Sequence, residues 1–268
     1  MENKKTLGII DQFLIATTKW KSYVSLTEQK GRTVVKYFLL ITLLITTITS
    51  VIPVAGYVTS IGGFQKFFSE TLPEFEYKDG ILDIDRRVTM DFLGMPITID
   101  STIEEYSAGD FDNTFPQQLL IGKNQLFIYQ SGQVFTAKLG TLYGRHINNQ
   151  TLANHSSFFN FLMFVYVFFG FLFELCSYLI GAFFCAILGV NISAQRKIKL
   201  SFSQIFKIAI YAKTCAAILD AVYSVIGNGI FGLSWIFISM IITFVFLSFG
   251  IIAHRSDKQD SDAKDLLT

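Results

Sequence analysis

Residues 158–189 read FFNFLMFVYVFFGFLFELCSYLIGAFFCAILG, and this stretch decides the fold. Its 32 residues include a single charged side chain, Glu174. About 20 apolar residues in a helix cross the hydrocarbon of a bilayer. The run is therefore too long for one perpendicular span and too short for two spans with a loop. We expect one tilted or extended helix with one end outside the hydrocarbon.

The composition of the whole chain agrees with a membrane protein of several spans. Its 268 residues are 51% hydrophobic and only 16% charged, whereas an ordinary soluble domain is about 25% charged. A net charge of +1 gives no attraction to polyanions, so we expect no nucleic acid partner. The three cysteines (Cys176, Cys185 and Cys215) all lie in apolar runs, and the three histidines are scattered. We therefore expect no disulfide framework, no metal and no cofactor.

Further apolar runs and the polar segments between them give the domain organisation. The N-terminal segment is amphipathic, and it either lies on the membrane surface or packs as a short helix on the other helices. The predicted segments are the N-terminal segment (1–36), transmembrane helix 1 (37–58), a β-rich domain (59–156), transmembrane helix 2 (157–189), a basic loop (190–207), transmembrane helices 3 (208–227) and 4 (233–253), and a tail (254–268).

Basic residues set the expected orientation in the membrane. Residues 1–36 carry seven Lys/Arg against three acids, and residues 190–207 carry four basic residues and no acid. Short loops rich in Lys/Arg stay in the cytoplasm. With four spans these two segments and the C-terminus lie on one side, so both termini are expected in the cytoplasm. The segment 59–156, with twelve acids and seven bases, is then extracytoplasmic.

Alternating patterns and turn residues predict strands in this polar segment. Phe75–Tyr77 and Ile81–Ile84 flank Lys78-Asp79-Gly80, which is typical of a hairpin. Residues 119–121, 125–129 and 133–139 are separated by short turns and predict a meander, and residues 96–99 alternate as a strand. Acids gather at Glu70/Glu74/Glu76, at Asp79/Asp83/Asp85 and over 104–112. Calcium prefers such oxygen ligands, but no calcium-loop motif is present, so a solvated surface is the favoured interpretation.

Charged residues within the predicted spans are the candidate functional site. Such groups cost about 2.5–3.5 kcal/mol each in hydrocarbon and normally face a partner or a cavity. Helical spacing places Lys213, Asp220 and Ser224 on one face of the third span and Glu174 on a polar face of the second. One hypothesis is that Glu174 and Asp220 share a proton beside Lys213, in a proton- or ligand-coupled site. The alternative is that these groups only join helices by hydrogen bonds.

Three stretches resemble a known family. They are Leu72-Pro-Glu-Phe-Glu-Tyr-Lys-Asp-Gly80, Leu119-Leu-Ile-Gly-Lys-Asn-Gln-Leu126 and Phe206-Lys-Ile-Ala-Ile-Tyr-Ala212. Together they resemble domain-of-unknown-function family 1189, membrane proteins of low-GC Gram-positive bacteria with a layout similar to Yip-like proteins. Some members carry the name maltodextrin-utilisation membrane protein, which implies a link to sugar uptake. The resemblance covers roughly residues 15–253 and brings no catalytic motif with it.

The sequence therefore predicts an all-α membrane four-helix bundle with an inserted extracytoplasmic β-rich (α+β) domain. No hydrolase, P-loop or Cys/His motif occurs, so we expect no enzyme. The expected function is that of an accessory, sensory or scaffolding protein of the bacterial cell envelope. Its expected partners are membrane lipids, a membrane protein or further copies of the chain, and an extracytoplasmic protein or glycan. The alternative is a component of a transport system that uses Glu174, Asp220 and Lys213.

Overall fold

The chain is mainly helical, with two small sheets. The computed structural model describes residues 7–104, 109, 111–112, 114–130, 132–142, 146–226 and 232–265. The chain divides into a helical unit (1–51 and 167–268) and a sheet unit (52–166). Within the described residues, three helical segments are long and apolar enough to cross a membrane: Gly31–Ser60, Ser156–Gln195 and Phe237–Arg255.

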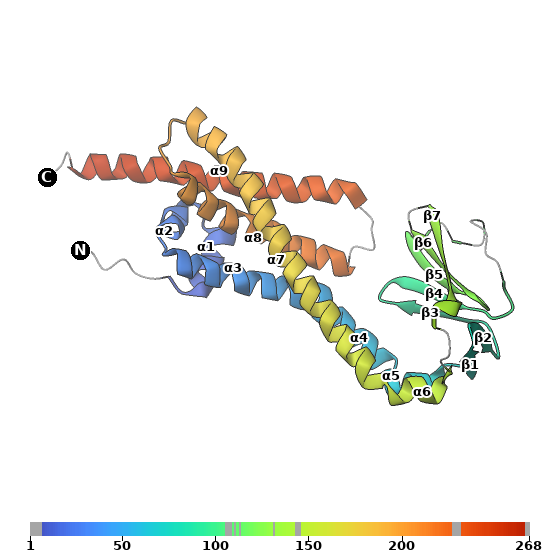
Figure 1. Cartoon of the computed structure of the whole chain (residues 1–268). Coiled ribbons are helices and arrows are strands. Elements are labelled where there is room, and N and C mark those ends of the chain that lie inside the picture. The colour runs from blue at the N-terminus through green and yellow to red at the C-terminus, as the bar shows by residue number, and fades with distance from the viewer. Residues whose placement is uncertain are drawn as a thin grey trace. The chain divides into compact units, whose positions relative to one another are not determined.

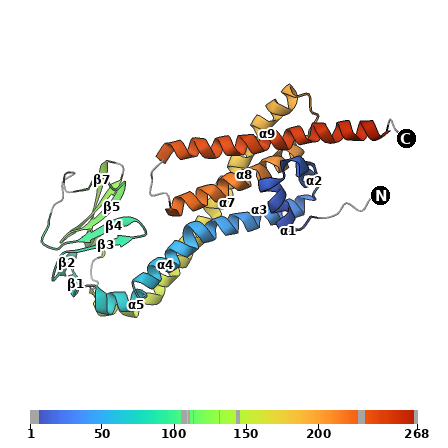
Figure 2. The same ribbon diagram turned by 180° about the vertical axis from the view of Figure 1, so that it is seen from behind.

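The helical unit is built around two long helices that lie side by side, α8 and α9 (Figure 1). The short N-terminal helices pack on this pair, as the view from behind also shows (Figure 2). Helix α7 starts in the sheet unit and continues into the helical unit. The elements are α1 (Ile9–Thr18), η1 (Trp20–Ser22), α2 (Tyr23–Thr27), α3 (Gly31–Thr46), the π-helical η2 (Thr47–Val51), α7 (Ser156–Gln195), α8 (Phe202–Ile226) and α9 (Gly232–Asp265).

Helix α7 is a single helix of 40 residues, so the apolar run that we quoted first is one uninterrupted element. It continues past the predicted end at residue 189, and the connection to α8 is shorter than the predicted loop. A reciprocal capping box starts α8: the backbone N–H of Gln204 donates to Ser201 Oγ (3.3 Å), and the N–H of Ser201 donates to Gln204 Oε1 (2.9 Å). Helix α9 extends beyond the predicted fourth span to Asp265.

Some predicted segments reach beyond what the structure describes. Residues 1–6 of the N-terminal segment, the end of the third predicted span at Gly227, the turn at 228–231 and the last three residues of the tail lie outside the described residues. The predicted boundaries at these places stay predictions.

The N-terminal segment packs on the other helices, which is the second of its two predicted arrangements. Ile15, Ala16 and Leu26 are buried in the same apolar core as residues of α8 and α9. The Tyr23 hydroxyl donates to the carbonyl of Ala16 (2.7 Å), and burial raises the pKa of Tyr23 above its usual range. A hydroxyl that is buried and bonded in this way fixes the segment in one register.

Polar contacts from α8 hold the same segment. Tyr211 donates its hydroxyl proton to Gln12 Oε1 (2.7 Å) in the buried core. Lys207 Nζ donates to the carbonyls of Thr27 (3.0 Å) and Gln29 (2.7 Å), at the end of α2. These carbonyls follow the last turn of a short helix and need a donor from outside it. Lys207, which the sequence placed in a basic loop, therefore lies on a helix and binds the chain's own backbone.

Glycines allow the helices to approach closely. A Cβ atom at Gly189 of α7 would lie 2.6 Å from Ile205 Cγ2 of α8 and 3.3 Å from Ile251 Cδ1 of α9. A Cβ atom at Gly250 of α9 would lie 2.6 Å from Tyr23 Cδ1. In membrane proteins, small residues at such positions let the helix backbones approach closely and increase the van der Waals contact between them.

The sheet unit holds a three-stranded sheet in the order β2-β1-β8 and a five-stranded sheet in the order β3-β4-β5-β6-β7. Short helices precede and follow the strands (Figure 1). The elements are α4 (Ile52–Ser60), α5 (Phe64–Lys66), the π-helical η3 (Phe67–Thr71), β1 (Phe75–Lys78), β2 (Ile81–Ile84), β3 (Val88–Phe92), β4 (Met95–Ile99), β5 (Gln117–Ile121), β6 (Gln125–Gln130), β7 (Gln133–Lys138), η5 (Leu139–Leu142), β8 (Ile147–Asn148) and α6 (Asn149–Asn154).

The predicted hairpin and meander are confirmed. β1 pairs antiparallel with β2, and β5, β6 and β7 pair antiparallel in order. In the first hairpin Asp79 (φ 51°) and Gly80 (φ 88°) both have positive φ, as a type I′ turn requires. The second hairpin, β3–β4, turns through Leu93 (φ 52°) and Gly94 (φ 88°) in the same way.

The close approach at Gly189 makes a specific prediction. Gly189→Ala pushes Ile205 of α8 and Ile251 of α9 away from α7. We expect the free energy of unfolding to fall by about 1–3 kcal/mol, the usual cost of overpacking a core. Gly56→Ala is the matched control, because it is also a helical glycine and nothing lies within 4 Å of its Cβ position. Thermal unfolding in mild detergent measures both. Equal midpoints for the two variants would contradict the tight α7–α8 contact.

Candidate functional site

A polar cavity of about 240 Å³ lies within the helical unit. Helices α3, α7 and α8, with η2, line it, and all four residues of the predicted intramembrane site contribute. The lining residues are Ile45, Thr49, Glu174, Ser177, Tyr178, Lys213, Ala217, Asp220, Ala221 and Ser224. With about 30 Å³ for each water, the cavity has room for several water molecules. We call it the intramembrane cavity.

Lys213 is positioned by its neighbours on α7. Its Nζ lies 5.4 Å from the centroid of the Tyr178 ring, which is the distance of a cation–π contact. The same Nζ lies where a Cβ atom at position 181 would be, so only glycine at that position leaves room for the ammonium group. Lys213 therefore lies over the backbone of α7, between Gly181 and Tyr178.

Asp220 links α8 to α9 through a hydrogen bond from one of its carboxylate oxygens, and its other oxygen has no hydrogen-bond partner among the described residues. Ser239 Oγ donates to Asp220 Oδ2 (2.7 Å). Asp220 Oδ1 is buried and has no hydrogen-bond partner within the part of the chain that the structure describes. A buried carboxylate oxygen without a donor costs free energy, so a donor from water or a ligand in the cavity would stabilise the site.

Tyrosine hydroxyls extend the polar contacts beside the cavity. Tyr178 Oη donates to the carbonyl of Ile210 (2.7 Å) and lies 3.3 Å from Thr214 Oγ1. Thr214 Oγ1 also lies 2.9 Å from Tyr37 Oη, so one threonine hydroxyl links α3, α7 and α8. All three side chains are buried. The sequence analysis did not select these residues, because an isolated Tyr or Thr in an apolar run is also common in ordinary helix packing.

The structure places the predicted residues around one cavity. Glu174, Lys213 and Asp220 line one cavity, and among the described residues none of the three forms an ion pair within 4.0 Å. Asp220 bonds to Ser239 rather than to Glu174. Ser224 donates to the carbonyl of Ala221 (2.8 Å), within its own helix. A proton shared by Glu174 and Asp220 stays a prediction.

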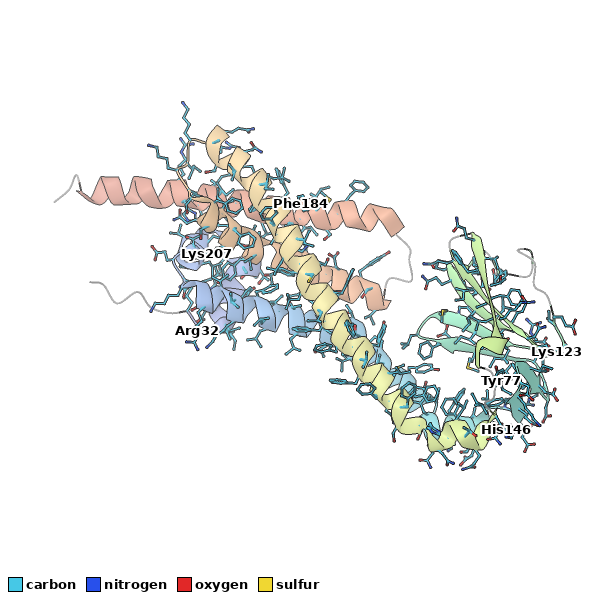
Figure 3. All side chains as sticks on the ribbon, viewed as in Figure 1. Arg32, Tyr77, Lys123, His146, Phe184 and Lys207 are labelled. Atoms are coloured by element: carbon cyan, nitrogen blue, oxygen red, sulfur yellow. The ribbon has the colours of Figure 1, made fainter. Side chains whose placement is uncertain are left out.

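The sheet unit has a polar groove of about 800 Å³. It brings together acids from two of the three clusters that the sequence analysis treated separately: Glu70, Glu74 and Glu76 of the first, and Asp83 and Asp85 of the second. His146 Nε2 lies 2.9 Å from Glu76 Oε1 there, and Figure 3 shows His146 close to α6. Its lining residues are Ser69, Glu70, Thr71, Leu72, Pro73, Glu74, Phe75, Glu76, Asp83, Asp85, Arg86, His146, Asn148, Asn149 and Gln150. We call it the polar groove.

Asn149 fixes the floor of the polar groove. Its Nδ2 donates to the carbonyls of Phe68, Leu72 and Pro73 at 3.0–3.1 Å, and its Oδ1 accepts from the N–H of Phe75 (2.9 Å). One amide therefore connects η3, the start of β1 and α6. The sequence analysis missed this residue, because its partners are backbone groups more than 70 residues away in the chain.

Within the described residues, no group of three or more His, Cys, Asp or Glu has the arrangement of a metal site. Glu105 and Asp110, which belong to the third predicted acid cluster, lie outside the described residues. The acids of the polar groove surround an open space rather than converging on one point. The groove therefore offers carboxylates and amides to a larger polar ligand.

Comparison with known proteins gives the family. The model of the family described as "Protein of unknown function (DUF1189)" matches residues 10–251. The chain belongs to the DUF1189 family. No curated protein and no solved structure matches it. The match covers both the intramembrane cavity and the polar groove, so both lie within the family's own region of this DUF1189 chain.

The position of Lys213 predicts an energetic coupling with Gly181. Gly181→Ala displaces the ammonium group, which is the end of a flexible side chain. We therefore expect the free energy of unfolding to fall by only about 0.5–1 kcal/mol, from the weakened contact between Lys213 and Tyr178. In a Lys213→Ala background the same change has nothing to displace and costs far less. A double-mutant cycle on thermal or denaturant unfolding in detergent measures the difference. Additive effects would contradict the contact between Lys213 and Gly181.

Proposed function

We propose that this DUF1189 chain is a non-enzymatic membrane protein of the cell envelope that acts as an accessory, sensory or scaffolding subunit. In this proposal α8 is a fourth span beside the three apolar helices, and both termini are cytoplasmic. The clustering of basic residues in 1–36 and 190–207 supports this orientation. The sheet unit is then extracytoplasmic and recognises a protein or a glycan.

The polar groove carries the proposal. Its volume of about 800 Å³ lies in the range of binding sites for small molecules and short chain segments. Carboxylates from β1 and β2 and amides from α6 face one space, so the groove offers acceptors and donors to hydroxyl and amide groups. Sugars and peptides both present such groups. The hydrogen bonds of Asn149 hold the floor in place and so preorganise the groove.

The helical unit supports a role as a subunit. Its large apolar side chains include many that are exposed, among them Phe173 at 74% and Phe184 at 62% exposure. Phe184 of α7 is labelled in Figure 3. In a membrane such side chains face either lipid or the helices of another protein. In the second case they would form the contact surface for a partner subunit.

A groove that recognises an external partner makes a testable prediction. Chemical crosslinking in intact cells, mild solubilisation and mass spectrometry identify the proteins bound to the tagged full-length chain. We expect Asp83→Asn together with Asp85→Asn to reduce recovery of the partner at least tenfold, because a single charged hydrogen bond contributes roughly 1.5–3 kcal/mol and tenfold corresponds to about 1.4 kcal/mol. The variant chain itself should be recovered at the level of the wild type.

The matched control is Glu104→Gln, which removes an exposed acid outside the groove that pairs with Lys123 (3.2 Å; Lys123 is labelled in Figure 3). It should leave recovery of the partner unchanged. If the groove variant and the control recover the same partners in the same amounts, the groove does not recognise the partner. A chain that is recovered only with its own copies would also contradict the accessory role.

A transport component is the second candidate, and Asp220 favours it. The unpartnered Oδ1 of Asp220 lies on a cavity that Glu174 and Lys213 also line. Ionisable groups around a small cavity within membrane helices are typical of proton and ligand pathways. The maltodextrin name carried by some members of the family would make sugar uptake the first process to examine.

Glu174→Gln separates the two candidates. It keeps the shape of the side chain and removes its charge, so a scaffold should keep its assembly and its partner. A transport component should lose most of the sugar-dependent uptake of its system, because a proton-linked site needs the carboxyl group. Uptake of labelled maltodextrin in cells and crosslinked recovery of the partner measure the two outcomes. Ser177→Ala, at the same cavity, is the control for changes of polarity without charge.

A further inference from the structure

The sheet unit also contains an apolar cavity of about 510 Å³. On one side its lining comes from α4, α5, η3, α6 and the first turns of α7, and on the other side from β1 to β5. Tyr57 is the one lining residue that carries a polar group. A cavity of this size lies within the range of ligand sites. We call it the apolar cavity.

One face of the five-stranded sheet carries an apolar row that crosses all five strands. The strand register places five residues in one row across it: Met90, Ile97, Leu119, Ile128 and Phe135. The first three line the apolar cavity, and the last two are 39% and 53% exposed. The apolar surface thus continues in the open beyond the cavity. The opposite face is covered, since Leu120 and Phe127 pack there with Phe111.

The helices that line the cavity are parts of candidate membrane spans. Tyr57 belongs to the segment Gly31–Ser60, and Phe159 and Met163 belong to Ser156–Gln195. At about 1.5 Å per residue the second segment is about 60 Å long, twice the hydrocarbon thickness of a bilayer. Helices that are long and apolar enough to cross a membrane therefore also form one wall of the cavity.

The chemistry of the wall selects the occupant. Water needs two to four polar partners in such a space, and the wall offers one hydroxyl group. A peptide segment, from this chain or another, would bury backbone N–H and C=O groups without partners. A hydrocarbon chain has no polar groups and therefore needs no hydrogen-bond partner in the cavity. We propose that the apolar cavity binds one acyl chain of a membrane phospholipid, which reaches it along Ile128 and Phe135. This inference goes beyond the proposed function, because it gives the sheet unit a lipid ligand at a second site.

Photolabelling of the full-length protein in phosphatidylcholine–phosphatidylglycerol vesicles tests the proposal. The probe is a phosphatidylcholine that carries a diazirine at the end of one acyl chain, and mass spectrometry maps its adducts. We expect adducts on β4 and β5 as well as on exposed helix residues such as Phe173, which serve as the internal reference. Adducts on the helices with none on the strands would overturn the proposal.

Two tryptophan variants supply the matched comparison. Leu119→Trp fills the cavity, and we expect strand adducts relative to the helix reference to fall about tenfold, a loss of roughly 1.4 kcal/mol in binding. Thr136→Trp adds the same ring on the opposite face, because Thr136 pairs with Phe127, and should leave the adducts unchanged. Ile97→Phe is a milder filling variant that keeps the test available if Leu119→Trp lowers stability. Equal adducts in all variants would overturn the proposal.

The source of the acyl chain is tested in the same vesicles. An excess of unlabelled free fatty acid should leave the strand adducts in place. Displacement by the free acid would assign the cavity to that ligand instead and overturn the phospholipid assignment. The labelling uses purified protein without partners, so it can fail while crosslinked partner recovery succeeds, and the reverse. The two proposals are therefore tested independently.

Discussion

Helix α7 has to satisfy two different environments along one unbroken backbone. Hydrocarbon cannot bond to peptide groups, so a spanning segment must be helical, and the apolar run of 158–189 allows no interruption. The helix is nevertheless about twice as long as the hydrocarbon is thick. Its first turns therefore belong to the sheet unit and line the apolar cavity, whereas its later turns pack through Gly181 and Gly189 against α8. The intramembrane cavity and the apolar cavity are both lined by this helix, so both depend on its continuity.

Much of the fold follows from local patterns in the sequence. The β1–β2 hairpin and the β5–β7 meander were predictable because Asp79-Gly80 and short polar turns separate alternating segments. The β3–β4 hairpin was not, since Leu93 in a left-handed turn gives no sequence signal. The parallel pairing of β4 with β5 depends on a long connection, and no local pattern specifies such a contact. The α8 boundary was missed because Ser201 and Gln204, an N-cap pair, lie within a segment that the basic residues marked as a loop.

The sequence was sufficient to predict which helix faces form the candidate site, but not which atoms are in contact there. Charges in apolar runs are rare, so helical spacing alone selected Glu174, Lys213 and Asp220, and they do line one cavity. Their partners were not predictable. Ser239, which donates to Asp220, lies on another helix, and Lys213 contacts α7 at Gly181 because glycine has no side chain there. The polar groove escaped prediction for a related reason. Its two acid clusters looked like solvated strand faces, and the amide that fixes its floor, Asn149, bonds only to distant backbone groups.

The cavity of the helical unit and the apolar cavity of the sheet unit favour different occupants, and this difference follows from the residues of their walls. The intramembrane cavity contains a buried carboxylate oxygen without a donor, so it favours water or a protonated group. The apolar cavity presents almost no polar group and favours hydrocarbon. The polarity of each site is thus unusual for its unit: polar groups line a cavity among apolar helices, and apolar groups line an open cavity within the sheet unit. Sites of this kind cost stability when they are empty, and a bound occupant recovers that cost. Occupancy of either cavity would therefore stabilise the unit that contains it.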